Sequence, residues 1–571
     1  MILNLKEVVN IKLTGAKILL KSLQEEGVDT IFGYPGGAVL DIYDELEKTD
    51  IRHITVRQEQ GAVHAADAYA RVSGGIGVCL VTSGPGATNT VTGIASAYMD
   101  SIPVVVLTGQ VPTRLIGNDA FQEVDIVGIT RPCTKHNYLI TRVEDIARTI
   151  KEAFHIAKSG RPGPVLVDLP KDLMSIKTDY KPVTDLQIKS YQPTYKPNIK
   201  QLHKVVNLIK KASKPLILAG GGVILSKASE ELKHFAERIE APVTSTLMGL
   251  GAFPTKTPLW LGMIGMHGTY RANMSSGSCD LLIAIGARFS DRVTGKTDVF
   301  LPNAKIVHID IDPTSIQKIV PVAIPVVGDC KTTLEMLNSL LDKEDLGNLN
   351  ERRKPWFDQI TEWKNTYRLA YEQKDIIKPQ YVIEKLYELT EGNAIITTEV
   401  GQNQMWTAQY YHFDRPNCFI TSGGLGVMGF GLPAAIGAQI ASPDRMVVDI
   451  AGDGSIQMNI QEMATAVQYN LPVKIVILNN QYLGMVRQWQ ELFYEKCYAC
   501  TGMEYAPDFL KLADAYGAIG LRATHPEEVV PVLKKGLSIP KTVIMEFRVE
   551  KEEKVYPMVP AGAPITDMLL V

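Results

Sequence analysis

Short apolar runs alternate with segments of helical periodicity along most of this chain. Within residues 12–180 the apolar runs are 30–33, 51–56, 76–82 and 103–108, each of a length that suits a buried strand. Helical segments are predicted between them, up to Leu46, over 59–72 and over 87–98. The pattern predicts a doubly wound α/β domain with mostly parallel strands.

The same alternation returns twice further along. Residues 171–200 lack periodicity and are rich in Lys, Pro, Tyr and Asp, which predicts a linker. Apolar runs at 215–219, 281–285 and 305–311 predict a second α/β domain, and the charged segment 342–380 predicts a helical connector. The predicted fold is therefore three doubly wound α/β domains, with a weak shared rhythm between the first and third. The predicted boundaries are 12–180, 195–341 and 381–549, followed by a tail at 550–571.

The third domain holds the most informative stretch. The apolar run 447–451 ends in Gly452-Asp453-Gly454, and residues 460–467 then show helical spacing, with Asn459 as the predicted N-cap. A second apolar run, 472–478, ends in Asn479-Asn480. A strand–helix–strand crossover of this kind predicts two neighbouring parallel strands, so Asp453 and Asn480 should meet at one sheet edge.

Both side chains offer oxygen, which Mg²⁺ prefers, and two protein oxygens leave octahedral positions for a diphosphate and water. Taken separately, each motif has an ordinary structural interpretation, as a strand-end turn or as a loop. Their combination across one crossover is what predicts a magnesium diphosphate site.

Composition narrows the remaining possibilities. Apolar residues make up 45% of the chain and charged residues 21%, as in soluble globular proteins, and the net charge of −3 gives no reason to expect nucleic acid as a partner. No apolar run is long enough for a membrane helix, and residues 1–11 resemble no signal or transit peptide. We expect a cytoplasmic protein. The seven scattered cysteines predict reduced thiols, and the Cys497/Cys500 pair lacks the partners of a zinc site.

The spacing of GDG and NN resembles the thiamine diphosphate (ThDP) motif. Over residues 12–571 the chain further resembles the catalytic subunit family of acetohydroxyacid synthase (acetolactate synthase), of the biosynthetic FAD-containing type. Motifs that carry the resemblance include VRQEQGAVHAADAYAR around Glu59, DAFQEVD around Gln122, RFSDRVTG from Arg288 and MVRQWQ from Met485. Gln58, Ala68 and Ser290 depart from residues frequent in the family, and none of these departures removes a proposed ligand.

The resemblance implies three catalytic residues, Glu59, Gln122 and Gly36. Glu59 matches the family's activating glutamate, whose carboxyl bonds the cofactor's aminopyrimidine; by itself, an acidic residue in a first helical turn also complements the helix dipole and needs no other role. In the family this glutamate serves the partner subunit's diphosphate site, which implies a homodimer at minimum.

The resemblance implies further ligands. The ThDP residues are Val400, Gly401, Gln402, Gly426, Met428, Gly452, Asp453, Gly454, Ser455, Asn480, Tyr482, Leu483, Gly484 and Met485. Those for Mg²⁺ are Asp453, Asn480 and the carbonyl of Tyr482, and those for substrate are Phe121, Lys171, Val486 and Trp489. The FAD residues are Arg161, Gly220, Gly221, Gly222, Thr246, Leu247, Met266, His267, Gly268, Gly286, Arg288, Arg292, Asp310, Ile311 and Asp329.

The implied activity is acetolactate synthesis: pyruvate is decarboxylated, and its two-carbon unit is joined to a second pyruvate or to 2-ketobutyrate, the first common step towards the branched-chain amino acids. FAD would have no net redox role. A small regulatory subunit is a further implied partner. Two alternatives stay open, a pyruvate oxidase-like ThDP/FAD oxidoreductase and a regulatory paralogue that binds nucleotides without catalysis. The tail could order over the site or be disordered.

Overall fold

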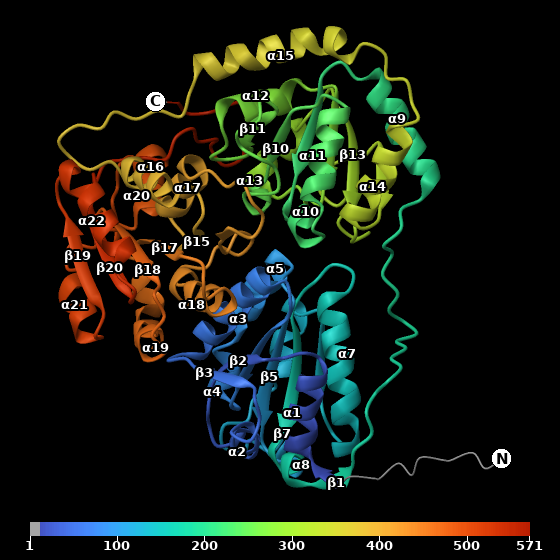
Figure 1. Ribbon diagram of the computed structural model, residues 1–571, viewed down its shortest axis with the longest axis vertical. Helices are drawn as coiled ribbons and strands as arrows, with labels where there is room; N and C mark the ends of the chain where they lie inside the picture. Colours follow the sequence, from blue (N-terminus) through green and yellow to red (C-terminus); the bar gives the residue numbers. More distant parts are fainter. Residues whose placement is uncertain (1–11, 571) are drawn as a thin grey trace. The chain divides into compact units, whose positions relative to one another are not determined.

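Three parallel six-stranded sheets form the framework of the chain. A computed structural model describes residues 12–570, so the expectation for residues 1–11 lies outside the described part. No described helix is long and apolar enough to cross a membrane. The three sheets, each flanked by helices, confirm the predicted α/β class (Figure 1).

The first sheet has the order β3-β2-β4-β5-β7-β6, with every pairing parallel. Its strands are β2 (Thr30–Tyr34), β3 (Arg52–Thr55), β4 (Gly77–Val81), β5 (Val104–Gln110), β6 (His136–Leu139) and β7 (Val165–Pro170). Its helices are α1 (Gly15–Glu25), α2 (Leu40–Leu46), α3 (Glu59–Ser73), α4 (Pro85–Thr88), α5 (Val91–Asp100), α6 (Ile126–Thr130), α7 (Ile146–Lys158) and α8 (Lys171–Ser175).

The middle sheet has a different order, β11-β10-β9-β12-β13-β14, so the direction of winding reverses between β9 and β12. Its strands are β9 (Pro215–Ala219), β10 (Val243–Ser245), β11 (Trp260–Met263), β12 (Leu281–Ile285), β13 (Lys305–Asp310) and β14 (Ile324–Val327). Its helices are α9 (Ile199–Lys211), α10 (Gly221–Leu225), α11 (Ser229–Arg238), α12 (Tyr270–Ser278), α13 (Asp291–Thr294) and α14 (Cys330–Leu341). The connector carries α15 (Leu349–Thr366), which packs along α12.

Both faces of the middle sheet are buried. Leu216 and Leu218 of β9 belong to one apolar cluster, whereas Ile217 and Ala219 belong to another. A parallel strand covered on both sides needs a continuous apolar run, which is why 215–219 and 281–285 were recognisable in the sequence.

The third sheet has the order β16-β15-β17-β18-β20-β19 and is also parallel throughout. Its strands are β15 (Ile395–Thr398), β16 (Phe419–Ile420), β17 (Val447–Gly452), β18 (Lys474–Asn479), β19 (Ile519–Ala523) and β20 (Val543–Arg548). Its helices are α16 (Pro379–Thr390), α17 (Gln402–Tyr410), α18 (Gly431–Ala441), α19 (Met463–Gln468), α20 (Gly484–Phe493), α21 (Phe509–Ala515) and α22 (Pro526–Ser538). Counted in chain order, its strands are arranged as in the first sheet.

Three local predictions were wrong. The linker starts after residue 180, because β8 (Lys177–Asp179) pairs antiparallel with β1 (Lys12–Thr14). The helix predicted over 87–98 is two helices, α4 and α5, separated by Asn89 and Thr90. Asn459 caps no helix: it sits with non-helical dihedral angles inside a 3₁₀ segment (Ile456–Glu462), and its side chain donates to the carbonyl of Gly429 instead.

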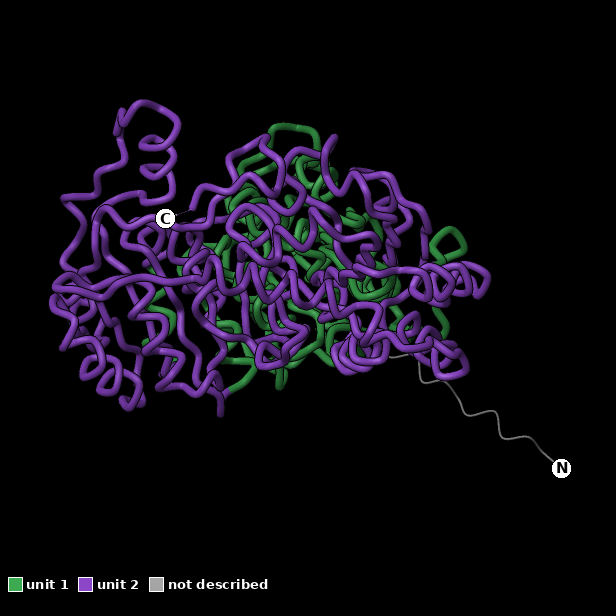
Figure 2. The backbone as a smooth tube through the Cα atoms, turned by 90° about the horizontal axis from the view of Figure 1, so that it is seen from above, with its two compact units in different colours: residues 1–192, 436–442, 461–469 green, residues 193–435, 443–460, 470–571 purple. Residues whose placement is uncertain are grey.

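The chain divides into two compact units, which Figure 2 shows in separate colours. Unit 1 contains residues 1–192, 436–442 and 461–469, of which 12 onward are described. Unit 2 contains residues 193–435, 443–460 and 470–571. Two short segments from the sequence region of the third sheet thus pack with the first sheet.

Candidate active site

The carboxyl ends of β17 and β18 carry the predicted metal ligands. The two strands are parallel neighbours with Gly452 opposite Leu478, so Asp453 and Asn480 leave the sheet at one edge, as the sequence predicted. The side-chain oxygen Oδ1 of Asn480 accepts the backbone N–H of Tyr482 at 3.1 Å, which closes the loop after β18.

Asp453 is only 1% exposed, yet neither carboxylate oxygen has a hydrogen-bond partner. Burial raises the pKa of Asp453 to about 7. The backbone N–H groups of Asp453 and Asn480 act to lower this pKa, but neither makes a hydrogen bond to the carboxylate. A buried carboxylate without donors is costly unless a cation neutralises it. This donor set fits a hard divalent ion, which prefers oxygen ligands.

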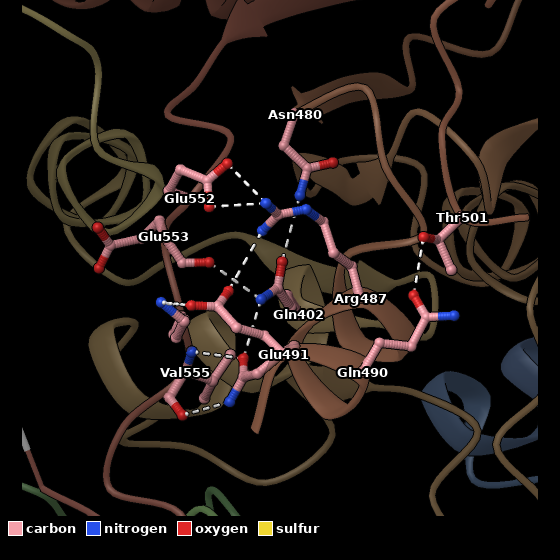
Figure 3. A network of polar contacts seen from close by, with 11 residues as sticks. Gln402, Asn480, Arg487, Gln490, Glu491, Thr501, Glu552, Glu553 and Val555 are labelled. Carbon is pink, nitrogen blue, oxygen red and sulfur yellow. Dashed lines mark hydrogen bonds and ion pairs between the residues drawn. The ribbon is translucent and has the colours of Figure 1, made fainter. Parts of the chain in front are cut away.

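A chain of amide side chains lies behind Asn480 (Figure 3). Asn480 donates to the side-chain oxygen of Gln402 at 3.2 Å, and Gln402 donates to Gln488 at 2.9 Å. Gln488 in turn exchanges two hydrogen bonds with the backbone of Val555, at 2.9 and 3.1 Å. The metal loop, α17, α20 and the start of the tail are therefore held as one polar network.

Arg487 adds a second link between α20 and the tail. One of its terminal nitrogens contacts both carboxylate oxygens of Glu552, at 2.6 and 2.7 Å (Figure 3). Its guanidinium also stacks on Tyr482, 4.6 Å from the ring centre. Later residues of the tail are packed as well. The backbone N–H of Val559 donates to the carbonyl of Met266 at 2.8 Å, and Ile565 is buried. The tail is thus ordered and packed within unit 2.

The loop that carries Met428 is fixed from two sides. Glu399, at the end of β15, accepts the backbone N–H of Gly429 at 2.6 Å, and Asn459 donates to the carbonyl of Gly429 at 2.7 Å. Glu399 is fully buried, and burial raises its pKa to about 7, although N–H groups at the start of α18 act to lower it. Gly426 and Gly429 both have positive φ, which favours glycine at these positions.

The winding of the middle sheet reverses between β9 and β12, and the turns that follow these two strands pack together. A Cβ on Gly220 would lie 2.1 Å from the carbonyl oxygen of Gly286, and one on Gly222 would lie 2.7 Å from the Cα of Gly286. The two strand-end turns therefore meet backbone to backbone. In sheets of this winding order, dinucleotides bind at this point.

The other predicted FAD residues have the following local contacts. Arg292 stacks over Trp489, 5.8 Å from the ring centre, which brings one proposed FAD residue against one proposed substrate residue. His267 is buried beside the carbonyl of Pro557, and burial lowers its pKa to about 4. Asp310 ends β13, and Asp329 caps α14 by accepting the N–H of Thr332. Arg161 belongs to unit 1, where it bonds Ser101 at 2.8 Å.

Unit 1 gathers the three predicted catalytic residues around one turn. Glu59 is the first residue of α3, and Asn89 donates to its carboxylate at 2.9 Å. A Cβ on Gly86 would lie 3.3 Å from Glu59 Oε1, and one on Gly84 would lie 2.8 Å from the carbonyl oxygen of Gln122. A Cβ on Gly36 would likewise lie 2.5 Å from the Cβ of Thr82.

Two predicted substrate residues of unit 1 lie at its surface. Phe121, next to Gln122, is 88% exposed, and Lys171 is exposed at the start of α8.

Sequence reasoning missed Asn89, the role of Glu399 and the contacts of Glu462. An amide breaking an otherwise helical pattern was the available signal for Asn89. No signal marked the two glutamates, because their partners are backbone groups distant in sequence. Cys497 and Cys500 are exposed free thiols, and no cluster of three or more His, Cys, Asp or Glu side chains suited to a metal occurs among the described residues.

Comparison with protein families covers all three sheet regions. Residues 13–129, 202–337 and 399–547 match the N-terminal thiamine pyrophosphate (ThDP) binding domain, the central domain and the C-terminal thiamine pyrophosphate binding domain of thiamine pyrophosphate enzymes.

Curated relatives align over almost the whole chain. The acetolactate synthase large subunit of Haemophilus influenzae is 49% identical over 564 residues, and the isozyme 3 large subunit of Escherichia coli is 49% identical over 565 residues, each alignment covering 98% of both chains. Chloroplastic acetolactate synthase 1 of Nicotiana tabacum is 48% identical, over 97% of this chain and 84% of the relative. This chain therefore belongs to the acetolactate synthase large-subunit family of thiamine pyrophosphate enzymes.

Proposed function

We propose that the chain decarboxylates pyruvate and joins the resulting two-carbon unit to a second pyruvate or to 2-ketobutyrate, the first common step of branched-chain amino acid biosynthesis. The observation that carries this proposal is the buried, unpartnered carboxylate of Asp453 beside Asn480, at the edge where the family binds its diphosphate. Bound ThDP supplies a carbon acid that can add to a ketone and accept the electron pair released with carbon dioxide.

The chain's own residues divide the remaining work. Asp453, Asn480 and the carbonyl of Tyr482 would hold Mg²⁺, and Met428, on a loop fixed by Glu399 and Asn459, would support the cofactor from below. Glu59 would bond the aminopyrimidine and hold the proton that its activation requires. Gln122 and Gly36, which with Glu59 surround the turn at residues 82–86, would face the reacting carbon.

Trp489 and Val486 of unit 2 would contact the acceptor, and Phe121 and Lys171 of unit 1 are further proposed substrate contacts. Trp489 is held by Arg292 on one face and meets Phe493 edge to face, so its indole is oriented before any substrate arrives. An oriented aromatic wall favours one acceptor over another through contact area.

FAD fits the middle domain through its winding order and the close glycine turns at Gly220 and Gly286. Arg288 and Arg292 suit a diphosphate because a guanidinium donates forked hydrogen bonds. In this proposal FAD stabilises the fold and has no net redox part. We further propose a cytoplasmic homodimer in which Glu59 serves the partner subunit's diphosphate, together with a small regulatory subunit, as the name "large subunit" of the relatives suggests.

Product analysis tests the reaction. Purified protein loaded with ThDP, Mg²⁺ and FAD is expected to form acetolactate from pyruvate, and 2-aceto-2-hydroxybutyrate when 2-ketobutyrate is added. Anaerobic bleaching of the flavin by pyruvate at the rate of turnover would instead indicate an oxidase, and the absence of any product would indicate a non-catalytic paralogue.

Glu59→Gln tests the proposed activator. The variant keeps the size of the side chain but cannot hold the carboxyl proton, so exchange of the ThDP C2 proton is expected to slow by about 100-fold or more while Mg-ThDP still binds. Exchange is read by quenched-flow NMR and binding by tryptophan fluorescence. Unchanged exchange would remove Glu59 from the mechanism.

A further inference from the structure

The loop that leads into α3 is held by a segment from the far end of the chain. The backbone N–H of Arg57 donates to Oε1 of Glu462 at 2.9 Å, and that of Gln58 donates to the same oxygen at 3.0 Å. The N–H of Thr55 donates to the hydroxyl of Tyr469 at 2.8 Å. These partners are more than 400 residues apart in sequence, and all lie within unit 1.

Glu462 is fully buried against the first turn of α3. A Cβ on Gly61 would lie 2.8 Å from Glu462 Oε1, so the carboxylate occupies the space that this glycine leaves. Its second oxygen accepts the hydroxyl of Thr465 at 2.6 Å. Both oxygens are therefore used, and the carboxylate has one orientation in this site.

The two N–H groups have no intrahelical acceptor because they precede the helix. Within the first turn, the side chain of Gln58 accepts the N–H of Gln60 at 2.7 Å. A backbone N–H that is shielded from water and has no acceptor destabilises the conformation in which it lies. The backbone on which Glu59 sits thus depends on the acceptor that Glu462 supplies.

We infer that Glu462 is a positioning residue for Glu59, since it fixes the backbone from which the activating carboxyl is presented. The inference rests on the proposed role of Glu59. Glu462 follows Asp453 by nine positions, so the stretch that begins at the metal ligand continues into the residue that orients the activator. Small displacements at a reacting centre lower rates steeply, about 100-fold for 1 Å.

The test compares Glu462→Ala with Glu462→Gln in the holoenzyme. Alanine removes the acceptor, and C2 proton exchange and kcat are expected to fall together by about 10-fold or more, with the Kd for Mg-ThDP within about 3-fold of wild type. Glutamine keeps an oxygen for both N–H groups, and its NH₂ can donate to the hydroxyl of Thr465. This variant is expected to recover most of the exchange rate.

Gln468→Ala is the matched control. It removes the contact between the Arg57 guanidinium and α19. The backbone N–H groups of Arg57 and Gln58 stay paired with Glu462, so exchange is expected to stay at the wild-type rate. Amide hydrogen exchange over residues 55–60 gives a second readout, with protection expected to fall in Glu462→Ala and not in the control.

Several outcomes would overturn the inference. One such outcome is that Glu462→Ala lowers the melting temperature but leaves the C2 exchange rate at the wild-type value. Glu462 would then have a purely structural role. Another is Glu462→Gln with exchange as slow as in alanine. If the alanine variant does not fold, Glu462→Asp takes its place, because its side chain is one methylene shorter and moves the acceptor away. Normal C2 exchange in Glu462→Asp would then contradict the inference. Glu59→Gln separates the two proposals: normal exchange in that variant refutes the proposed role of Glu59, whereas slow exchange there with normal exchange in Glu462→Ala refutes only the inference.

Discussion

His308 is a single residue whose burial couples stability to pH. It is fully buried on β13, its Nε2 donates to the carbonyl of Ala287 at 2.8 Å, and Nδ1 has no hydrogen-bond partner. Burial lowers the pKa of His308 from 6.5 to about 4, even with Asp310 3.8 Å from Nε2. The folded state keeps the ring neutral, while the unfolded state binds a proton below pH 6.5.

Wild type is therefore expected to lose stability as the pH falls from 6.5 towards 4. His308→Gln keeps the bond to Ala287 and removes the proton site, so its loss between pH 7 and pH 5 should be smaller by about 2 kcal/mol. Urea unfolding at both pH values measures this difference. His203→Gln, at an exposed position, should behave as wild type, and equal pH slopes in wild type and His308→Gln would refute the argument.

For single residues, the sequence predicted a role where the residue type has few possible roles at its position. Asp453 and Asn480 were predicted because their oxygens follow two strands that must be neighbours. Glu399 and Glu462 were not, because each binds backbone N–H groups that only the tertiary fold brings within reach. Any buried glutamate has the same appearance in a sequence.

Among the elements, α3 is the one packed most closely through backbone. A Cβ on Gly77 of β4 would lie 2.0 Å from the carbonyl oxygen of Ala66, and one on Gly437 of α18 would lie 1.9 Å from that of Ala65. Gly77 of β4 and Gly437 of α18 thus both pack against the backbone of α3, and neither position has room for a methyl group. The position of α3 is fixed by this contact as well as by its N-terminal bonds.

Gly437→Ala is expected to destabilise the protein although alanine favours helices. The helix preference contributes up to about 1 kcal/mol, whereas the methyl group would meet a backbone oxygen that cannot yield, at a cost of about 1–3 kcal/mol. A lower melting temperature by calorimetry would confirm this. Gly37→Ala is the control, because a Cβ there meets nothing within 4 Å, and equal melting temperatures for the two variants would contradict the packing argument.

Elements buried on both faces were the easiest to predict. The runs 215–219 and 281–285 match β9 and β12, since such strands are continuously apolar. Short or edge elements were missed: β8 pairs only with β1, and the break between α4 and α5 places Asn89 against Glu59. Tertiary partners decide these features, and local sequence does not encode them.

For the whole molecule, the tail belongs to the core of unit 2. Ile565 is 4% exposed and packs in the apolar cluster that contains Phe289 and Phe300. Ile565→Ala should therefore cost about 2–5 kcal/mol and loosen residues 288–300, as measured by thermal unfolding and amide hydrogen exchange. Asp567→Ala, at an exposed neighbouring position, should change neither, and a neutral Ile565→Ala would mean that the tail is not part of the core.

The composition of unit 1 has a consequence for synthesis on the ribosome. The first 192 residues contain α3 and Glu59, but the segments 436–442 and 461–469 that complete the unit are made much later. At roughly 5–20 residues per second, the interval between residues 192 and 461 lasts roughly 15–55 s. The nascent N-terminal region lacks the helix that covers Ala65 until residue 441 is made, and it lacks the acceptor for Arg57 and Gln58 until residue 462 is made. Glu59 therefore reaches its final setting only when translation is four-fifths complete.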